Sequence, residues 1–188
     1  MRREDRRAFL LDTAAALIDQ GGIGALSFES LAEAAEVTKT LPYAYFESKD
    51  EILLTLFDHV IGRLDDEVEA LLASDGDFET IIERSLDVWF RAAKDHGRLV
   101  GALLDGGSVP GLAAAVRRRD RASAKLWHDL VAERFGLRDS EAQVLAAMLN
   151  TTATATVELW MSKKGSRANL VEAFVTMAAS AARGLQRG

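Results

Sequence analysis

SFESLAEAAEVTKTLPYAYF, residues 27–46, is the stretch of this sequence that decides the fold. Ser27 is a favourable N-cap for a helix over about 28–35, and Thr38 can cap a second helix over about 39–46. Two short helices joined by a tight turn form a helix-turn-helix, a motif whose second helix fits the major groove of DNA. The pattern therefore predicts a nucleic-acid-binding unit near the amino end of the chain.

The second helix of this motif is predicted to present an aromatic and polar face to solvent. At helical spacing Leu41 and Phe46 turn toward the core, and Tyr45 can turn either way. Hydroxyl, ammonium and aromatic groups suit contacts with phosphates and base edges. The candidate DNA-contacting residues come from this face, from the two caps and from the start of the following helix, and they are Ser27, Thr38, Lys39, Thr40, Tyr43, Ala44, Tyr45 and Lys49.

Helical periodicity continues through the rest of the chain, where strand-like alternation is scarce. The stretches Ser48–Glu51 and Ser140–Gln143 match the capping-box pattern that opens a helix. Residues 98–111 hold four glycines and Pro110, so we expect this segment to be irregular. The predicted helices cover about 3–20, 28–35, 39–46, 49–73, 78–96, 112–135, 141–164 and 167–185.

These elements predict an all-α fold with two domains. Residues 1–47 are expected to form a three-helix DNA-binding domain that contains the helix-turn-helix, and residues 48–188 a helical domain for ligand binding and dimerisation. The last two predicted helices carry apolar stripes with small residues such as Ala178 and Ala182, which allow close approach of another helix. We expect a two-fold homodimer, because motifs of this kind usually read paired half-sites.

The middle of the chain is rich in large apolar side chains that can line a cavity. A cavity with apolar walls and a few polar anchors is the usual form of a small-molecule site, and it favours a hydrophobic effector. Asn150 and the nearby threonines are the candidate anchors, although a helical threonine can also bond its own backbone. The candidate ligand-binding residues are Phe57, Ile61, Leu64, Trp89, Leu103, Leu104, Trp127, Val131, Met148 and Thr152.

Composition excludes some chemistry and constrains the rest. The chain has 188 residues, 48% of them hydrophobic, a net charge of −6 and no cysteine, which rules out disulfides and thiolate catalysis. Within residues 1–50, nine Asp and Glu outnumber six Lys and Arg, so DNA binding requires cations clustered on one face, as four arginines within residues 2–7 are. Since no run approaches the roughly 18–20 apolar residues of a membrane span and no signal peptide is evident, we expect a cytoplasmic protein.

The order of residues within 8–57 is shared with a known family. The matching residues are Ala15, Leu17, Ile18, Gly21, Gly24, Leu26, Ser27, Leu31, Ala32, Ala35, Val37, Thr38, Lys39, Tyr43, Tyr45, Phe46, Ser48, Lys49, Asp50, Glu51, Ile52 and Leu53. In these residues and their spacing the chain resembles the TetR family of bacterial transcriptional regulators. The resemblance implies a homodimeric repressor that leaves a palindromic operator when a small molecule binds, and whose last two helices form a four-helix bundle with those of its partner.

Two positions depart from the family pattern. Glu36 stands in the turn where the family usually has glycine, so Glu36 is expected either to adopt a left-handed conformation at some cost or to alter the turn. Pro42 stands where an aliphatic residue is usual; a first helical turn tolerates proline, but an earlier helix start would be distorted by it. Both changes bear on how the second helix would meet DNA.

No catalytic constellation is evident in the sequence, so we expect neither an enzyme nor a cofactor. His59, His96 and His128 are far apart and lack metal-ligand spacing. An alternative hypothesis is a helical small-molecule-binding or interaction protein that has lost specific DNA recognition through the two departures. A small helical enzyme is a third hypothesis, because catalytic residues can come together from distant parts of a chain.

Overall fold

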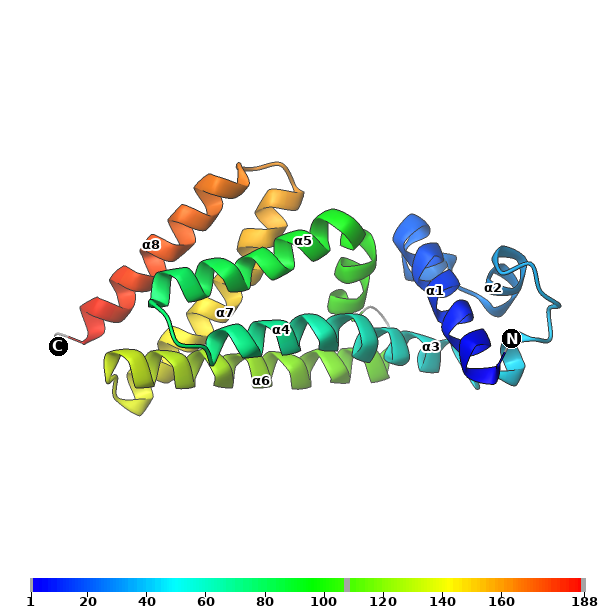
Figure 1. The fold of residues 1–188 in the computed structure, drawn as a ribbon, viewed down its shortest axis with the longest axis horizontal. Helices are drawn as coiled ribbons and strands as arrows, with labels where there is room; N and C mark the ends of the chain where they lie inside the picture. Colours follow the sequence, from blue (N-terminus) through cyan, green and yellow to red (C-terminus); the bar gives the residue numbers. More distant parts are fainter. Residues whose placement is uncertain (1, 107–108, 187–188) are drawn as a thin grey trace. The chain divides into compact units, whose positions relative to one another are not determined.

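The computed structural model describes residues 2–106 and 109–186, and these residues form helices and turns without a strand. The prediction of an all-α fold is confirmed. No single helix within these ranges is long and apolar enough to cross a membrane; only the bent pair α5 and α6, taken together, reaches the required length and composition. In chain order the elements are α1 (Arg3–Gly21), η1 (Ile23–Ala25), α2 (Phe28–Ala34), η2 (Pro42–Ala44), α3 (Lys49–Leu56), η3 (Phe57–Ile61), α4 (Gly62–Leu72), α5 (Phe78–Asp105), α6 (Pro110–Phe135), α7 (Asp139–Met161) and α8 (Arg167–Leu185) (Figure 1).

The chain divides into two compact units. The first unit combines Met1–Arg63 with Lys94–Arg117, and the second combines Leu64–Ala93 with Arg118–Gly188. Helices α4, α5 and α6 therefore each contribute residues to both units. The elements η1 and η2 are 3₁₀ turns and η3 is a π-helical turn.

The core of the first unit forms where α1 packs against α2 and α3. On α1, Leu10, Ala14 and Ile18 recur every four residues, and none of the three is exposed to solvent. Burial of an aliphatic side chain of this kind contributes roughly 1.5–3 kcal/mol. The residues that α2 and α3 bury in this unit are Leu31, Ala32, Ile52, Leu53 and Leu56.

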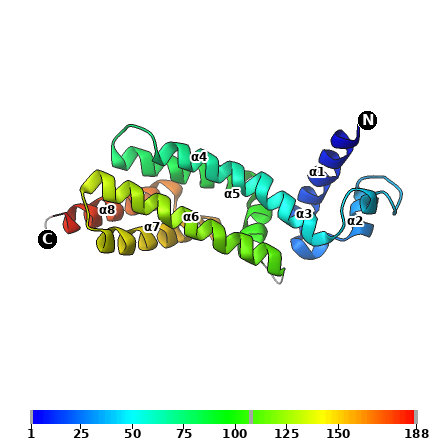
Figure 2. The ribbon, with the colours of Figure 1, turned by 90° about the horizontal axis from the view of Figure 1, so that it is seen from below.

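The core of the second unit is drawn from all five of its helices. Helices α7 and α8 lie beside one another in both views, and buried Ala178 and Ala182 on α8 are small enough to permit that approach (Figures 1 and 2). Three pairs of aromatic rings meet edge to face in this unit, an arrangement worth about 0.5–1.5 kcal/mol beyond burial. These pairs are Phe78 with Phe135, Phe90 with Trp160, and Trp127 with Phe174.

The predicted α-helix over 39–46 is wrong. Only Pro42–Ala44 forms a helical turn, and it is a 3₁₀ turn. Leu41 donates its amide to the Thr38 carbonyl at 2.9 Å, and Tyr45 donates to Pro42 at 3.0 Å, so these bonds span three residues instead of four. Proline lacks the amide hydrogen with which an α-helix starting at residue 39 would close its first bond.

Other boundaries differ from those expected. The single helix predicted over 49–73 is interrupted by the π-helical turn η3. The segment 98–111, expected to be irregular, is helical as far as Asp105 and again from Pro110, while Gly107 and Ser108 lie outside the described residues. Pro110 opens α6, where its missing amide costs nothing. The N-cap of α7 is Arg138 and not Ser140.

A break within α5 is stabilised from another helix of the same unit. His96 has non-helical backbone angles, φ −144° and ψ 41°, so a new helical run begins after it with unpaired amides. The Asp19 carboxylate at the end of α1 accepts a hydrogen bond from the Leu99 amide at 2.9 Å, taking the place of an N-cap side chain. The guanidinium of Arg98 donates in turn to the Gln20 carbonyl.

Replacement of Asp19 by alanine should therefore destabilise the protein. We expect the free energy of unfolding to fall by about 0.5–2 kcal/mol, the usual cost of losing an N-cap. Urea denaturation of wild type and of Asp19→Ala measures this difference. Asp12→Ala, an exposed carboxylate on the same helix, is the matched control and should leave the midpoint nearly unchanged; equal effects of the two substitutions would contradict the capping role.

Candidate functional site

The first helix of the motif and its turn form as the sequence indicates. The Ser27 hydroxyl accepts a hydrogen bond from the Ser30 amide at 3.0 Å, and the Ser30 hydroxyl accepts one from the Ser27 amide at 2.9 Å. This reciprocal cap fixes the first turn of α2. Glu36 has φ 54°, so of the two outcomes expected at this position the left-handed conformation is the one that the structure shows. The Val37 amide then closes the turn on the Ala32 carbonyl at 3.0 Å.

Segment 38–46 follows this turn and presents most of the predicted contact residues to solvent. Tyr43 is 58% exposed, although it is large and aromatic. Tyr45 and Lys49 are half-buried. The predicted residues that are exposed are Ser27, Thr38, Lys39, Thr40, Tyr43 and Ala44.

The ring of Phe28 stacks on the ring of Tyr43. The two centroids are 4.2 Å apart and the planes differ by 11°. Helical spacing places Phe28 on the same face of α2 as the buried residues Leu31 and Ala32, yet Phe28 is only half-buried and lies against Tyr43. Helical periodicity could not reveal this contact, because it depends on where the next segment places its aromatic residue.

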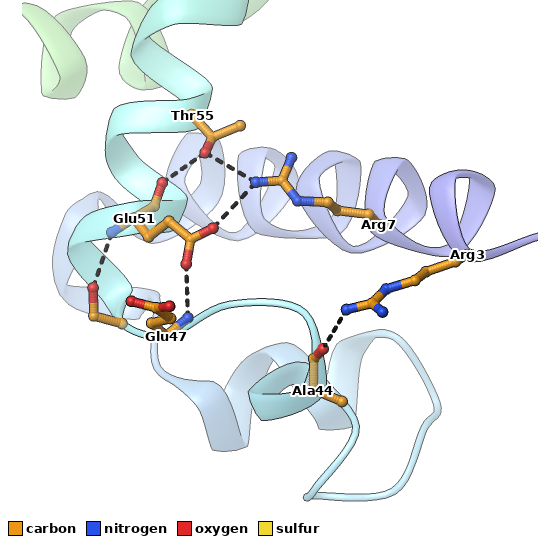
Figure 3. Close-up of polar contacts among 7 residues, drawn as sticks. Arg3, Arg7, Ala44, Glu47, Glu51 and Thr55 are labelled. Atoms are coloured by element: carbon orange, nitrogen blue, oxygen red, sulfur yellow. Dashed lines mark hydrogen bonds and ion pairs between the residues drawn. The ribbon is translucent and has the colours of Figure 1, made fainter.

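Arg7 of α1 anchors the end of segment 38–46 (Figure 3). Its guanidinium donates to the Glu51 carboxylate at 3.2 Å and to the Thr55 hydroxyl at 3.4 Å, and it lies 4.9 Å from the ring centroid of Phe46. The other Glu51 oxygen accepts from the Glu47 amide at 2.7 Å. Within the predicted capping box Ser48 does cap α3, but the Glu51 carboxylate reaches the Glu47 amide and not the Ser48 amide.

Arg3 lies one helical turn before Arg7 and reaches the middle of the same segment. It donates to the Ala44 carbonyl at 3.5 Å (Figure 3). Its guanidinium also lies 5.8 Å from the ring centroid of Tyr45. Arg2 pairs with Asp5 on its own helix. Three of the four arginines at the amino end therefore make side-chain contacts with the protein itself, and two of these three, Arg3 and Arg7, contact segment 38–46.

Lys49 also has a partner within the protein. Its ammonium donates to the Ile23 carbonyl at 2.6 Å, which connects the start of α3 to η1. An ammonium has three donors, so this bond leaves donors for a phosphate. Lys39, by contrast, is exposed and has no side-chain hydrogen bond or ion pair within the described residues.

The candidate ligand-binding residues fall in both units. Phe57, Ile61, Leu103 and Leu104 belong to the first. The second unit holds the other six, of which Trp127 and Val131 are buried in its core, while Met148 is 60% exposed. The remaining members of the second set are half-buried, and they are Leu64, Trp89 and Thr152.

The threonine hydroxyls of α7 bond to their own helix. Each donates to the carbonyl four residues before it, at distances of 2.7–3.3 Å. The Asn150 side-chain carbonyl accepts instead from the Ser123 hydroxyl of α6 at 2.7 Å. Only the amide group of Asn150 therefore keeps its donors for another partner. The threonines concerned are Thr151, Thr152, Thr154 and Thr156.

A polar cluster in the second unit was missed by the sequence analysis. Arg119 of α6 is only 14% exposed, and its Nε donates to both carboxylate oxygens of Asp65 on α4 at 3.0 and 2.9 Å. The guanidinium also lies 4.7 Å from the ring centroid of Trp89 on α5. Burial raises the pKa of the Asp65 carboxyl, and the attraction of Arg119 only partly opposes this effect. An arginine within a run of charged residues carries no sequence signal that it turns inward.

His128 lies between two carboxylates of the second unit. Its Nδ1 is 3.1 Å from Asp129 and its Nε2 is 3.0 Å from Asp139, where α7 begins. The hydrogen bond with Asp129 is the largest of the effects that raise the pKa of the His128 imidazole. This arrangement connects the end of α6 to the start of α7.

Large apolar side chains remain exposed on α7 and α8. Val144 and Met148 lie one turn apart on α7 and are 62% and 60% exposed. Isolated exposed apolar residues are ordinary, whereas these residues recur on two neighbouring helices. The remaining exposed members are Leu159, Met161, Met177 and Leu185.

Replacement of Lys49 by alanine should affect stability more than replacement of Lys39, because the Lys49 ammonium bonds within the protein and the Lys39 ammonium is exposed. We expect Lys49→Ala to lower the free energy of unfolding by about 1–2 kcal/mol, since a hydrogen bond to a charged group is worth about 1.5–3 kcal/mol and this ammonium is half-buried. Lys39→Ala should change it by less than about 0.5 kcal/mol. Urea denaturation of both variants tests the assignment, which equal losses of stability would overturn.

Comparison with known proteins agrees with this geometry. Residues 10–56 match the model of the tetR family of bacterial regulatory proteins. The transcriptional regulator EthR of Mycobacterium tuberculosis (strain ATCC 25618 / H37Rv) is 30% identical over 95 residues, which are 50% of this chain and 44% of EthR, so less than half of that relative is covered. The transcriptional activator FasR of Mycolicibacterium smegmatis is 23% identical over 162 residues, which are 85% of this chain and 74% of FasR.

The fold also has a counterpart among solved structures. The structure of AibR in complex with isovaleryl coenzyme A and operator DNA superimposes with a TM-score of 0.70 and 18% identity, and the match covers 92% of this chain and 97% of AibR. The motif, the family model and the relatives agree with one another, and they show that residues 10–56 of this chain are similar to the tetR family of bacterial regulatory proteins.

Proposed function

We propose that this protein is a ligand-responsive transcriptional regulator that acts in the bacterial cytoplasm as a homodimer. Segment 38–46 is the observation that carries the proposal. It presents an ammonium, hydroxyls and an exposed aromatic ring on a backbone that α1 and α2 hold in place. Such a surface suits DNA, because phosphates and base edges accept hydrogen bonds in the major groove.

The two parts of the chain have different roles in this proposal. Residues 1–47 bind DNA, with Lys39, Thr40 and Tyr43 as the principal contacts. Residues 48–188 bind the effector and form the dimer. The exposed apolar side chains of α7 and α8 support a two-fold interface, since their burial against a second copy would remove them from water. A two-fold axis would present two copies of segment 38–46 to half-sites about 34–36 Å apart on a palindromic operator.

Release from the operator follows if the effector binds a second conformation of the protein more tightly. Coupling of this kind is reciprocal, so operator DNA must weaken effector binding by the same factor. The large apolar side chains of the carboxy-terminal region support a small hydrophobic effector. AibR, which shares the fold, was crystallised with an acyl thioester of coenzyme A and with operator DNA. Repression is the simplest outcome of binding at a promoter, although the relative FasR is an activator.

Selection of binding sites from a random DNA pool tests the proposal. We expect wild type to recover a palindrome, and Tyr43→Ala to lose it or to relax its base preferences, because Tyr43 is the most prominent exposed ring of segment 38–46. Size-exclusion chromatography and circular dichroism would confirm that both proteins are folded dimers. A folded wild-type dimer that enriches no sequence would instead favour a helical ligand-binding protein without specific DNA recognition.

The salt dependence of DNA binding tests the role of Lys39. Each phosphate neutralised contributes about −0.9 to the slope of log affinity against log salt. Lys39→Ala should therefore weaken binding to the selected operator and flatten this slope by about 0.9, as measured by fluorescence anisotropy at several salt concentrations. Lys94→Ala removes an exposed ammonium from α5 and serves as the control. An unchanged slope for Lys39→Ala would exclude its contact with phosphate.

A further inference from the structure

We infer that Phe28 is a specificity-determining residue that acts by holding Tyr43 in the orientation in which it meets DNA. The inference rests on the proposed function. It adds Phe28 of α2, which affects DNA recognition through the side chain of Tyr43. Phe28 is a positioning residue in this scheme, because Tyr43 and not Phe28 reaches the bases or phosphates.

The backbone around Tyr43 gives its side chain little support. An α-helix would surround residue 43 with a ladder of bonds spanning four residues, but here Pro42–Ala44 is a single 3₁₀ turn with one such bond, from the Phe46 amide to the Pro42 carbonyl. An exposed tyrosine on such a turn has two side-chain torsions to order when it binds. Ordering one side chain at an interface typically lowers affinity by about twofold to tenfold.

The stack with Phe28 removes most of that freedom before DNA arrives. With the centroids 4.2 Å apart and the planes within 11°, one face of the Tyr43 ring is covered and the plane of the ring is set. Tyr43 nevertheless remains 58% exposed, so more than half of its surface stays accessible. The pair thus combines a fixed orientation with an open contact surface.

Phe28 is itself held firmly enough to act as a support. It is the first residue of α2 and follows Ser27, whose side chain and amide form the reciprocal cap with Ser30. Ser27 was predicted to contact DNA; through this cap it also fixes the turn that carries Phe28. A path of contacts therefore runs from the cap of α2 through Phe28 to Tyr43.

A double-mutant cycle on the selected operator tests the inference. The proteins are wild type, Phe28→Leu, Tyr43→Ala and the double variant, each assayed on the operator and on operators with single base-pair changes. We expect Phe28→Leu to lower affinity about twofold to tenfold and to relax preference at the same base pairs as Tyr43→Ala. Phe28→Leu should have little further effect once Tyr43 is alanine, since contacting residues are not additive.

Two further variants separate positioning from stability. Phe28→Tyr keeps an aromatic ring and should retain the base preferences. If Phe28→Leu caused only a structural defect, it would alter affinity without changing the base preferences. Phe9→Leu is the matched control, because Phe9 is a 40% exposed phenylalanine of α1, and it should bind as wild type does. The inference would be overturned if a folded Phe28→Leu protein kept the wild-type base preferences, or if the losses of affinity in the cycle were additive. The proposed function itself would be overturned if wild type selected no operator.

Discussion

The missing amide hydrogen of Pro42 is the constraint on which the arrangement of the motif depends. An α-helix beginning at Lys39 would close its first bond from residue 42 to the Thr38 carbonyl, and proline cannot make it. Segment 38–46 therefore bonds mostly over three residues, with one bond over four from the Phe46 amide to the Pro42 carbonyl, and side chains from α1 and α2 add support. These supports are the contacts of Phe28 with Tyr43, of Arg3 with Ala44, and of Arg7 with Phe46.

Because of these contacts, several cationic side chains in and beside the motif are bonded within the protein. Arg3 and Arg7 face the protein and stabilise the segment, and Lys49 donates to a backbone carbonyl. The surface proposed to contact DNA is left with an ammonium, hydroxyls and an aromatic ring, in a protein whose net charge is −6. Recognition by such a surface rests more on directional contacts than on bulk attraction to phosphate, which makes the orientation of each side chain matter.

In the second unit apolar side chains fill the core, and several polar side chains near it have partners within the protein. Arg119 is held by Asp65 and by the Trp89 ring, and the threonine hydroxyls of α7 return to their own helix. Its exposed apolar side chains lie on α7 and α8, whose buried small residues let the two helices pack closely. The surface proposed for a partner copy is thus distinct from the core that each copy makes alone.

Sequence alone was sufficient for the features that depend on local physics. The period of apolar residues predicted the long helices, the bounds of α8 agree with those expected, and Glu36 was recognised as a left-handed turn residue. The domain boundary and the roles of individual contact residues stay predictions. Tertiary structure decided what local rules leave open: whether Phe28 lies against the core or against Tyr43, and whether Arg7 and Arg119 face solvent or the protein. Each of these depends on which groups from distant parts of the chain come within bonding distance, and a periodic pattern carries no information about that distance.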